Sequence, residues 1–154
     1  MTLITNRGKT NHRKLIVDLI KSSKEVIIFS GWMTEDGFKK LLPSFEEAIK
    51  NGAKITIFTN EKHTKLDPKT NLKAYGICHV LAKSKTLHSK IYYFQNNSLF
   101  TAVIGSANMT NGGLVSSEEL SVKLEGKIDS PEHEEIYNYL KDLKKEYGEC
   151  TKVR

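Results

Sequence analysis

Residues 87–114 constrain the chain more than any other stretch, because two apolar runs joined by a short polar turn predict a β-hairpin there. His88 and Lys90, two residues apart and so on one face, stand at the start of the first run. Ser106 and Asn108 stand just past the end of the second run. A hairpin folds the chain back on itself, so its first and last residues meet at one end. We therefore expect these four side chains, all able to contact a phosphate, to gather there.

Whether Ser106 faces the same way as His88 depends on the length of the turn. A two-residue turn at residues 96–97 pairs His88 with Gly105 and sends Ser106 to the other face of the hairpin. A three-residue turn at residues 96–98 pairs His88 with Ser106 and places the polar groups on one face. A shared site requires the three-residue turn or a local bulge, and this is what we predict.

Helices and strands alternate before the hairpin, and a strand and a helix follow it. Apolar stripes at helical spacing predict helices, and short continuous apolar runs predict buried strands. The expected helices span residues 10–23, 34–51 and 131–147, and the expected further strands span residues 25–31, 53–59, 77–82 and 119–124. Pro43 lies inside the second helix, so we expect a kink or a break near Leu42. This order predicts an α/β fold with a mixed, mostly parallel sheet and helices on both faces.

The length of 154 residues indicates one domain, which we place at residues 1–150, followed by a charged tail at residues 151–154. No apolar run is long enough for a membrane span and the N-terminus has no signal-peptide pattern, so we expect a cytoplasmic protein without membrane partners. Cys78 and Cys150 show no metal-ligand spacing, and we predict two free thiols in a reducing compartment. The net charge of +6 favours anionic partners.

Taken as an ordered set, the polar residues of the hairpin resemble the signature of the phospholipase D superfamily. That signature runs H-x-K and then G-S-x-N, which stand here at residues 88–90 and 105–108. The wider string, HSKIYYF followed by AVIGSANMTNGGL and SSEEL, looks like the single-motif nuclease branch, which includes catalytic domains of metal-independent restriction endonucleases. The resemblance is tight over residues 87–124 and looser before them. It implies a phospholipase D-like fold for the single catalytic domain.

Gln95 and Glu119 stand at two further positions of the family pattern. The family Asp, five residues after the motif Lys, falls at Gln95; in the family that Asp generally supports the structure, and several nuclease relatives lack it. The resemblance also implies a functional Glu eleven positions after the motif Asn, which is Glu119. Strand alternation instead places Glu118 on the apolar face of the following strand, so Glu118 remains the alternative.

The resemblance implies phosphodiester cleavage by a covalent route that needs no metal and no other cofactor. His88 would attack phosphorus to form a phosphohistidine, and Glu119 would orient a histidine ring. Lys90, Ser106 and Asn108 would donate hydrogen bonds to the non-bridging oxygens. A second histidine must protonate the leaving oxygen, and the chain carries one such motif. The resemblance therefore implies a homodimer with one composite site at its twofold axis.

Nucleic acid is the expected substrate, because a basic chain suits contacts with a phosphate backbone. We expect DNA in preference to RNA. Trp32 could lie at the rim of the site or pack in the core. The alternatives to a nuclease are a non-catalytic module of the same fold that binds nucleic acid or dimerises, and a phospholipase or phosphatidyl transferase. The candidate backbone contacts are Lys62, Lys65, Lys69, Lys73, Lys83 and Lys85. We expect ordinary roles for the remaining histidines, with the first two as candidate rim contacts: His12, His63, His79 and His133.

Overall fold

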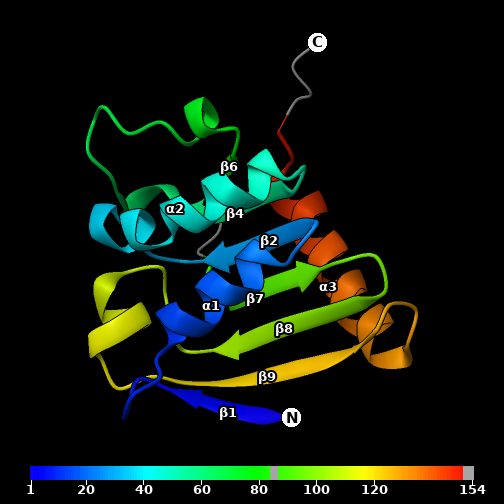
Figure 1. The fold of residues 1–154 in the computed structure, drawn as a ribbon. Coiled ribbons are helices and arrows are strands. Elements are labelled where there is room, and N and C mark those ends of the chain that lie inside the picture. Colours follow the sequence, from blue (N-terminus) through cyan, green and yellow to red (C-terminus); the bar gives the residue numbers. More distant parts are fainter. Residues whose placement is uncertain (84–86, 151–154) are drawn as a thin grey trace.

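The computed structural model describes residues 1–83 and 87–150 (Figure 1). Within them, seven strands form one sheet in the order β1-β9-β8-β7-β2-β4-β6. The strands are β1 (Thr2–Thr5), β2 (Glu25–Ser30), β4 (Lys54–Asn60), β6 (Cys78–Ala82), β7 (Lys90–Gln95), β8 (Leu99–Gly105) and β9 (Leu120–Lys127). The predicted tail at residues 151–154 and the candidate contact Lys85 lie outside the described residues.

The sheet is mixed, as predicted, but its pairing is not mostly parallel. β2, β4 and β6 lie parallel to one another. β7, β8, β9 and β1 form the other half of the sheet, and each pairs antiparallel with its neighbours. β7 and β8 are joined by a short turn, which requires antiparallel pairing, whereas parallel neighbours need a long crossover between them. The predicted α/β class, with a mixed sheet and helices on both faces, is confirmed.

Alternate residues of the central strands point to opposite faces of the sheet, and each face has its own apolar core. The helices are α1 (His12–Lys21), α2 (Glu35–Lys50) and α3 (Pro131–Tyr147). α1 and α2 cover one face, where Ile28 and Tyr92 share a cluster with Ile16 (Figure 1). α3 covers the other face, where Leu140 shares a cluster with Phe29.

Side-chain caps define where the first two helices begin. Asn11 accepts a hydrogen bond from the backbone N–H three residues later at 2.9 Å, and Thr34 does the same at 3.2 Å. α2 runs through Pro43 without interruption, so of the expected kink or break the break is wrong. Pro43 deprives the carbonyl of Lys39 of its donor, and both residues are exposed, so water can replace the missing hydrogen bond.

Several short elements have no counterpart in the sequence prediction. β1 lies at the edge of the sheet and pairs with β9. β3 (Met33–Thr34) and β5 (Thr64–Lys65) form a separate two-stranded sheet. The Gly-rich segment after β8 contains a π-helical turn at Gly112–Ser116. None of these elements exceeds five residues, which is too short for hydrophobic periodicity to reveal.

Cys78 and Cys150 form a disulfide with their Cα atoms 5.8 Å apart, so the prediction of two free thiols is wrong. Cys78 begins β6, and Cys150 follows α3, which lies against β6. Tertiary packing brings together cysteines that are 72 residues apart, a proximity that spacing in the sequence does not encode. The bond also removes the argument for a reducing compartment. Among the described residues, no helix combines the length and the apolar character that crossing a membrane requires.

Candidate active site

The β7–β8 hairpin turns through Asn97 and Ser98, so the prediction of a three-residue turn is wrong. The N–H of Asn96 donates to the carbonyl of Leu99 at 3.0 Å. The side-chain Oδ1 of Asn96 accepts from the N–H groups of Ser98 and Leu99 at 3.0 and 2.8 Å. This local bonding selects a two-residue turn that lies one position later than residues 96–97.

Ser106 reaches the site because it lies just beyond the end of β8, where strand alternation no longer decides the direction of a side chain. Its N–H donates to the carbonyl of Leu120 at 3.1 Å, and its Oγ accepts from the N–H of Leu120 at 3.0 Å. The same hydroxyl donates to the carboxylate of Glu119. Gly105 permits this close approach of β9, since a Cβ there would collide with the carbonyl of Leu120. Ser106 and Glu119 are thus joined between neighbouring strands.

The ammonium group of Lys90 lies against the imidazole of His88. Its Nζ is 3.3 Å from Nδ1 and 3.4 Å from Nε2, and it donates to the carbonyl of His88 at 2.8 Å. His88 is exposed, whereas Lys90, the first residue of β7, is half-buried. Burial lowers the pKa of Lys90 below its ordinary value, while the negative charge of Glu119 acts in the opposite direction. Glu119 therefore acts on Lys90 as well as on Ser106.

His88, Lys90 and Ser106 line one open depression on the surface. Its border includes Leu120 of β9 and Tyr139 of α3. These two large apolar side chains are 54% and 45% exposed. Three residues of the motif therefore share one accessible surface. The exposed apolar side chains beside them would gain stability if they were buried.

Asn108 is held by the end of β2. Its Oδ1 accepts from the N–H of Trp32 at 3.2 Å and lies 3.3 Å from the Oγ of Ser30. Ser30 also accepts from the N–H of Met109 at 2.8 Å, and it pairs with Lys90 across β2 and β7. These contacts use Oδ1, so they do not engage the N–H donors of the same amide. Sequence reasoning missed Ser30, because a buried serine at the end of a strand carries no signal of such a role.

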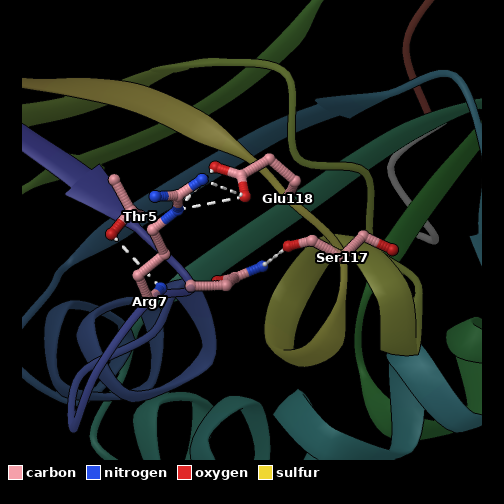
Figure 2. A network of polar contacts seen from close by, with 5 residues as sticks. Thr5, Arg7, Ser117 and Glu118 are labelled. Atoms are coloured by element: carbon pink, nitrogen blue, oxygen red, sulfur yellow. Dashed lines mark hydrogen bonds and ion pairs between the residues drawn. The ribbon is translucent and has the colours of Figure 1, made fainter.

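Glu118, the alternative to Glu119, is engaged elsewhere. Figure 2 shows the guanidinium of Arg7 facing its carboxylate. The three N–O distances between these groups are 2.8, 2.9 and 3.0 Å. The hydrogen bonds and the charge of Arg7 lower the pKa of Glu118. Asn6, beside Arg7, donates to the carbonyl of Ser117 at 3.0 Å. The segment before β9 is thereby tied to the segment after β1, and Glu119 is the carboxylate that contacts Ser106.

The structure brings the predicted residues to one end of the sheet. β2 and β8 end there, and β7 and β9 begin there. The parallel strands β2, β4 and β6 also end on this side, which is where open α/β sheets commonly bind ligands. The residues that meet or adjoin at this end are His88, Lys90, Ser106, Asn108 and Glu119.

Over residues 9–153 the chain matches the family described as the NgoFVII restriction endonuclease N-terminal PLD domain, where PLD denotes phospholipase D. The chain belongs to this family. The predicted relation to the phospholipase D superfamily is confirmed. The match supports a nuclease of the phospholipase D superfamily, and hence a hydrolytic enzyme that acts on nucleic acid, as the class of this protein.

Solved structures with the same fold include two that cover nearly the whole chain. Nuc, a phospholipase D family member from Salmonella typhimurium, is 17% identical with a TM-score of 0.71, and the match covers 97% of this chain and 96% of Nuc. NucT from Helicobacter pylori is 12% identical with a TM-score of 0.69, covering 97% of this chain and 98% of NucT. Polyphosphate kinase from Porphyromonas gingivalis matches 94% of this chain but 23% of its own length, with a TM-score of 0.65 and 14% identity. No curated protein matches the chain in sequence.

Gln95, where the superfamily signature has Asp, lies at the opposite end of β7 from Lys90. A strand of this length separates its two ends by about 17 Å. The Oε1 of Gln95 accepts from the hydroxyl of Tyr93 at 2.6 Å, which is a contact within the fold. In this member of the PLD domain family, the departure from the signature therefore falls away from the candidate site.

The other histidines lie in ordinary surroundings, apart from one. His12 is buried between Asn6 and Ser121, at 2.7 and 2.8 Å, so its candidate role at the rim is wrong. His79 and His133 bond to the hydroxyls of Thr59 and Tyr93, at 2.9 and 2.8 Å. His63 instead stacks on the indole of Trp32. Among the described residues, no three His, Cys, Asp or Glu side chains are grouped so that they could hold a metal ion.

Proposed function

We propose that this PLD domain cleaves phosphodiester bonds of DNA through a covalent phosphohistidine, without a metal ion. The observation that carries the proposal is the exposed imidazole of His88, with the Lys90 ammonium 3.3 Å from its ring nitrogen. The joined pair Ser106 and Glu119 lies at the same end of the sheet. A nucleophile, a fixed cation and hydrogen-bond donors on one surface are what phosphoryl transfer requires.

His88 is the nucleophile in this scheme. A bond forms between its attacking nitrogen and phosphorus, while the bond between phosphorus and the leaving oxygen breaks. Lys90 and the amide N–H groups of Asn108 donate to the non-bridging oxygens, where negative charge increases in the transition state. The contacts of Asn108 support this role, because Trp32 and Ser30 meet its Oδ1 and not its donors.

Ser106 and Glu119 change partners when phosphate binds. The hydroxyl of Ser106 donates to Glu119 in the structure, so its proton must turn to a phosphate oxygen to contribute. The carboxylate of Glu119 then becomes available to accept from a histidine N–H, which orients the ring. Ser106 keeps its place during this exchange, because its backbone and its Oγ also bond to Leu120.

A second copy of the chain supplies the second histidine. Its His88 protonates the leaving oxygen and then activates the water that hydrolyses the phosphohistidine. The exposed Leu120 and Tyr139 support a contact between copies, because they place apolar surface beside the first His88. A twofold dimer buries the same patch on both subunits, so both histidines approach the axis.

Exposed lysines near the site support a nucleic-acid substrate. Lys62 and Lys65 follow β4, and Lys83 follows β6, so these three stand at the end of the sheet that carries His88. Lys69 and Lys73 lie on the chain segment that returns to the start of β6, and Lys73 belongs to the 3₁₀ helix η2 (Leu72–Tyr75). Cations placed this way contact the phosphate backbone without reading sequence.

The central experiment measures DNA cleavage in the presence of EDTA. Activity should persist in EDTA and should fall by at least about 10⁴-fold in the variant His88→Ala. The control is Asn97→Ala, which changes an exposed residue in the turn at the far end of the hairpin and should stay near the unaltered rate. Strict dependence on a divalent metal, or a fully active His88→Ala variant, would contradict the proposal.

Mixing subunits tests the composite site. Sedimentation should give a dimer, and equal amounts of unaltered and His88→Ala subunits should re-form about a quarter of their dimers with two intact histidines. The activity of the mixture should then be half of what simple dilution of the unaltered enzyme gives. Activity that follows simple dilution after complete exchange of subunits, or an active monomer, would show that each chain works alone.

A further inference from the structure

Trp32 is a large aromatic side chain that the fold leaves partly uncovered. It lies in the connection between β2 and β3, and 43% of it is exposed. Its indole stacks on the ring of His63, with the ring centroids 4.2 Å apart and the planes 10° from parallel. An indole with an imidazole on one face and solvent access elsewhere presents a flat apolar surface to a ligand.

The backbone of Trp32 is bound directly to the candidate site. Its N–H donates to Oδ1 of Asn108 at 3.2 Å, and its carbonyl accepts from the hydroxyl of Ser30 at 2.6 Å. Met33, the next residue, forms a β-bridge with Met109. The indole therefore extends from a backbone that is one hydrogen bond away from a side chain assigned to phosphate binding.

We propose that Trp32, supported by His63, is a stacking platform for an unpaired nucleobase next to the phosphodiester that the site cleaves. This inference rests on the proposed function and adds a binding residue and a substrate class to it. His63 covers one face of the indole and holds it flat, and the base stacks against the surface that remains exposed. Lys62 and Lys65, exposed on either side of His63 in the sequence, contact the backbone of the same strand.

The platform selects single-stranded or locally opened nucleic acid. In a duplex both faces of a base are covered by its neighbours, so a base must leave the stack before an aromatic side chain can take it. Stacking is tolerant of sequence because every base has a flat face. The platform therefore favours unpaired strands without selecting a particular base.

Fluorescence of the protein tests this directly, because Trp32 is the one tryptophan in the chain. The His88→Ala variant in EDTA is titrated with a single-stranded oligonucleotide, with an abasic strand of the same length, and with the duplex. Base stacking should quench Trp32 with the first strand and not with the abasic strand. Trp32→Ala, measured by fluorescence anisotropy of labelled strands, should weaken binding of the base-bearing strand by about 5- to 100-fold and leave the abasic strand unchanged.

Two further variants distinguish stacking from a general loss of apolar surface. Trp32→Phe retains an aromatic surface and should recover most of the lost affinity. Leu99→Ala removes another exposed apolar side chain, 49% exposed at the far end of the hairpin, and should change neither strand's binding. Equal affinity for base-bearing and abasic strands, or an unaffected Trp32→Ala variant, would overturn the platform while cleavage continues. Failure to bind or cleave any strand would instead overturn the nuclease proposal and the platform with it.

Discussion

Asn96 and Asn108 stand near opposite ends of the same hairpin, and each uses its Oδ1 to accept backbone hydrogen bonds. Asn96 accepts from Ser98 and Leu99, two and three residues later, and closes the turn. Asn108 accepts from Trp32, which is 76 residues earlier in the chain. The same side-chain chemistry is therefore local at one end of the hairpin and assembles a site from distant segments at the other. The comparison shows that the partner's place in the chain, and not the residue type, separates a turn from a candidate active site.

The largest expected effect is a difference in kcat between variants of these two asparagines. Asn108→Ala should lower kcat by about 10²–10³-fold, because it removes donors to the oxygens that gain charge in the transition state. Asn96→Ala, the matched variant at the other end, should leave kcat within about twofold and lower the free energy of unfolding by about 1 kcal/mol through loss of turn hydrogen bonds. Steady-state kinetics and urea denaturation of both variants measure the two effects. Equal losses of kcat would erase the distinction between the two ends.

The second expected effect is on the pH dependence of kcat/KM. It concerns only the end of the hairpin that carries the candidate site. Burial lowers the pKa of Lys90, so its ammonium loses the proton at a lower pH than an ordinary lysine with a pKa of 10.5. Because the charged form binds phosphate in the proposed mechanism, kcat/KM should fall as pH rises through this lowered pKa, about tenfold per pH unit beyond it. Lys90→Arg should remove the alkaline fall, since arginine stays charged.

Glu119→Gln provides the counterpart to that experiment. The charge of Glu119 raises the pKa of Lys90 against the effect of burial, so removing it should move the alkaline fall to a still lower pH. The profile is measured as kcat/KM across alkaline pH at constant ionic strength. An alkaline fall that does not move in either variant would assign it to a group other than Lys90.

The smallest expected effect is at Gln95, at the turn end. Gln95→Ala should leave kcat and KM within about twofold, because the side chain contacts Tyr93 within the fold and not the site. The hydroxyl of Tyr93 also meets His133 at 2.8 Å, so the loss of stability should be about 1 kcal/mol. Cleavage assays and thermal denaturation check both statements. A loss of activity comparable to that of Asn108→Ala would mean that the two ends of β7 are coupled.

Features that depend on neighbouring residues are predictable from the sequence. The final helix has the predicted bounds, 131–147, because Pro131 and a helical apolar stripe both lie within it. The class of fold follows from the order of such segments. The site residues also gather at one end, because a hairpin returns the chain whatever the length of its turn.

Features that depend on register or on distant partners are not predictable in this way. A turn that differs by one residue reverses every side chain of a strand, and Ser106 reaches its place by leaving the strand and not by the predicted register. The choice between Glu118 and Glu119 depends on Arg7, which lies 111 residues away. Trp32 follows β2 and His63 follows β4, so their stacking depends on how two separate connections pack together.

The disulfide between Cys78 and Cys150 makes a closed covalent ring, and every candidate catalytic residue from His88 to Glu119 lies within it. The disulfide lowers the conformational entropy of the unfolded chain. For a ring of this size, that favours the folded state by about 4 kcal/mol. A single proteolytic cut inside the ring leaves both halves of the motif in one molecule. Where the cut lies between His88 and Glu119, a reductant is also needed to separate these two residues as fragments.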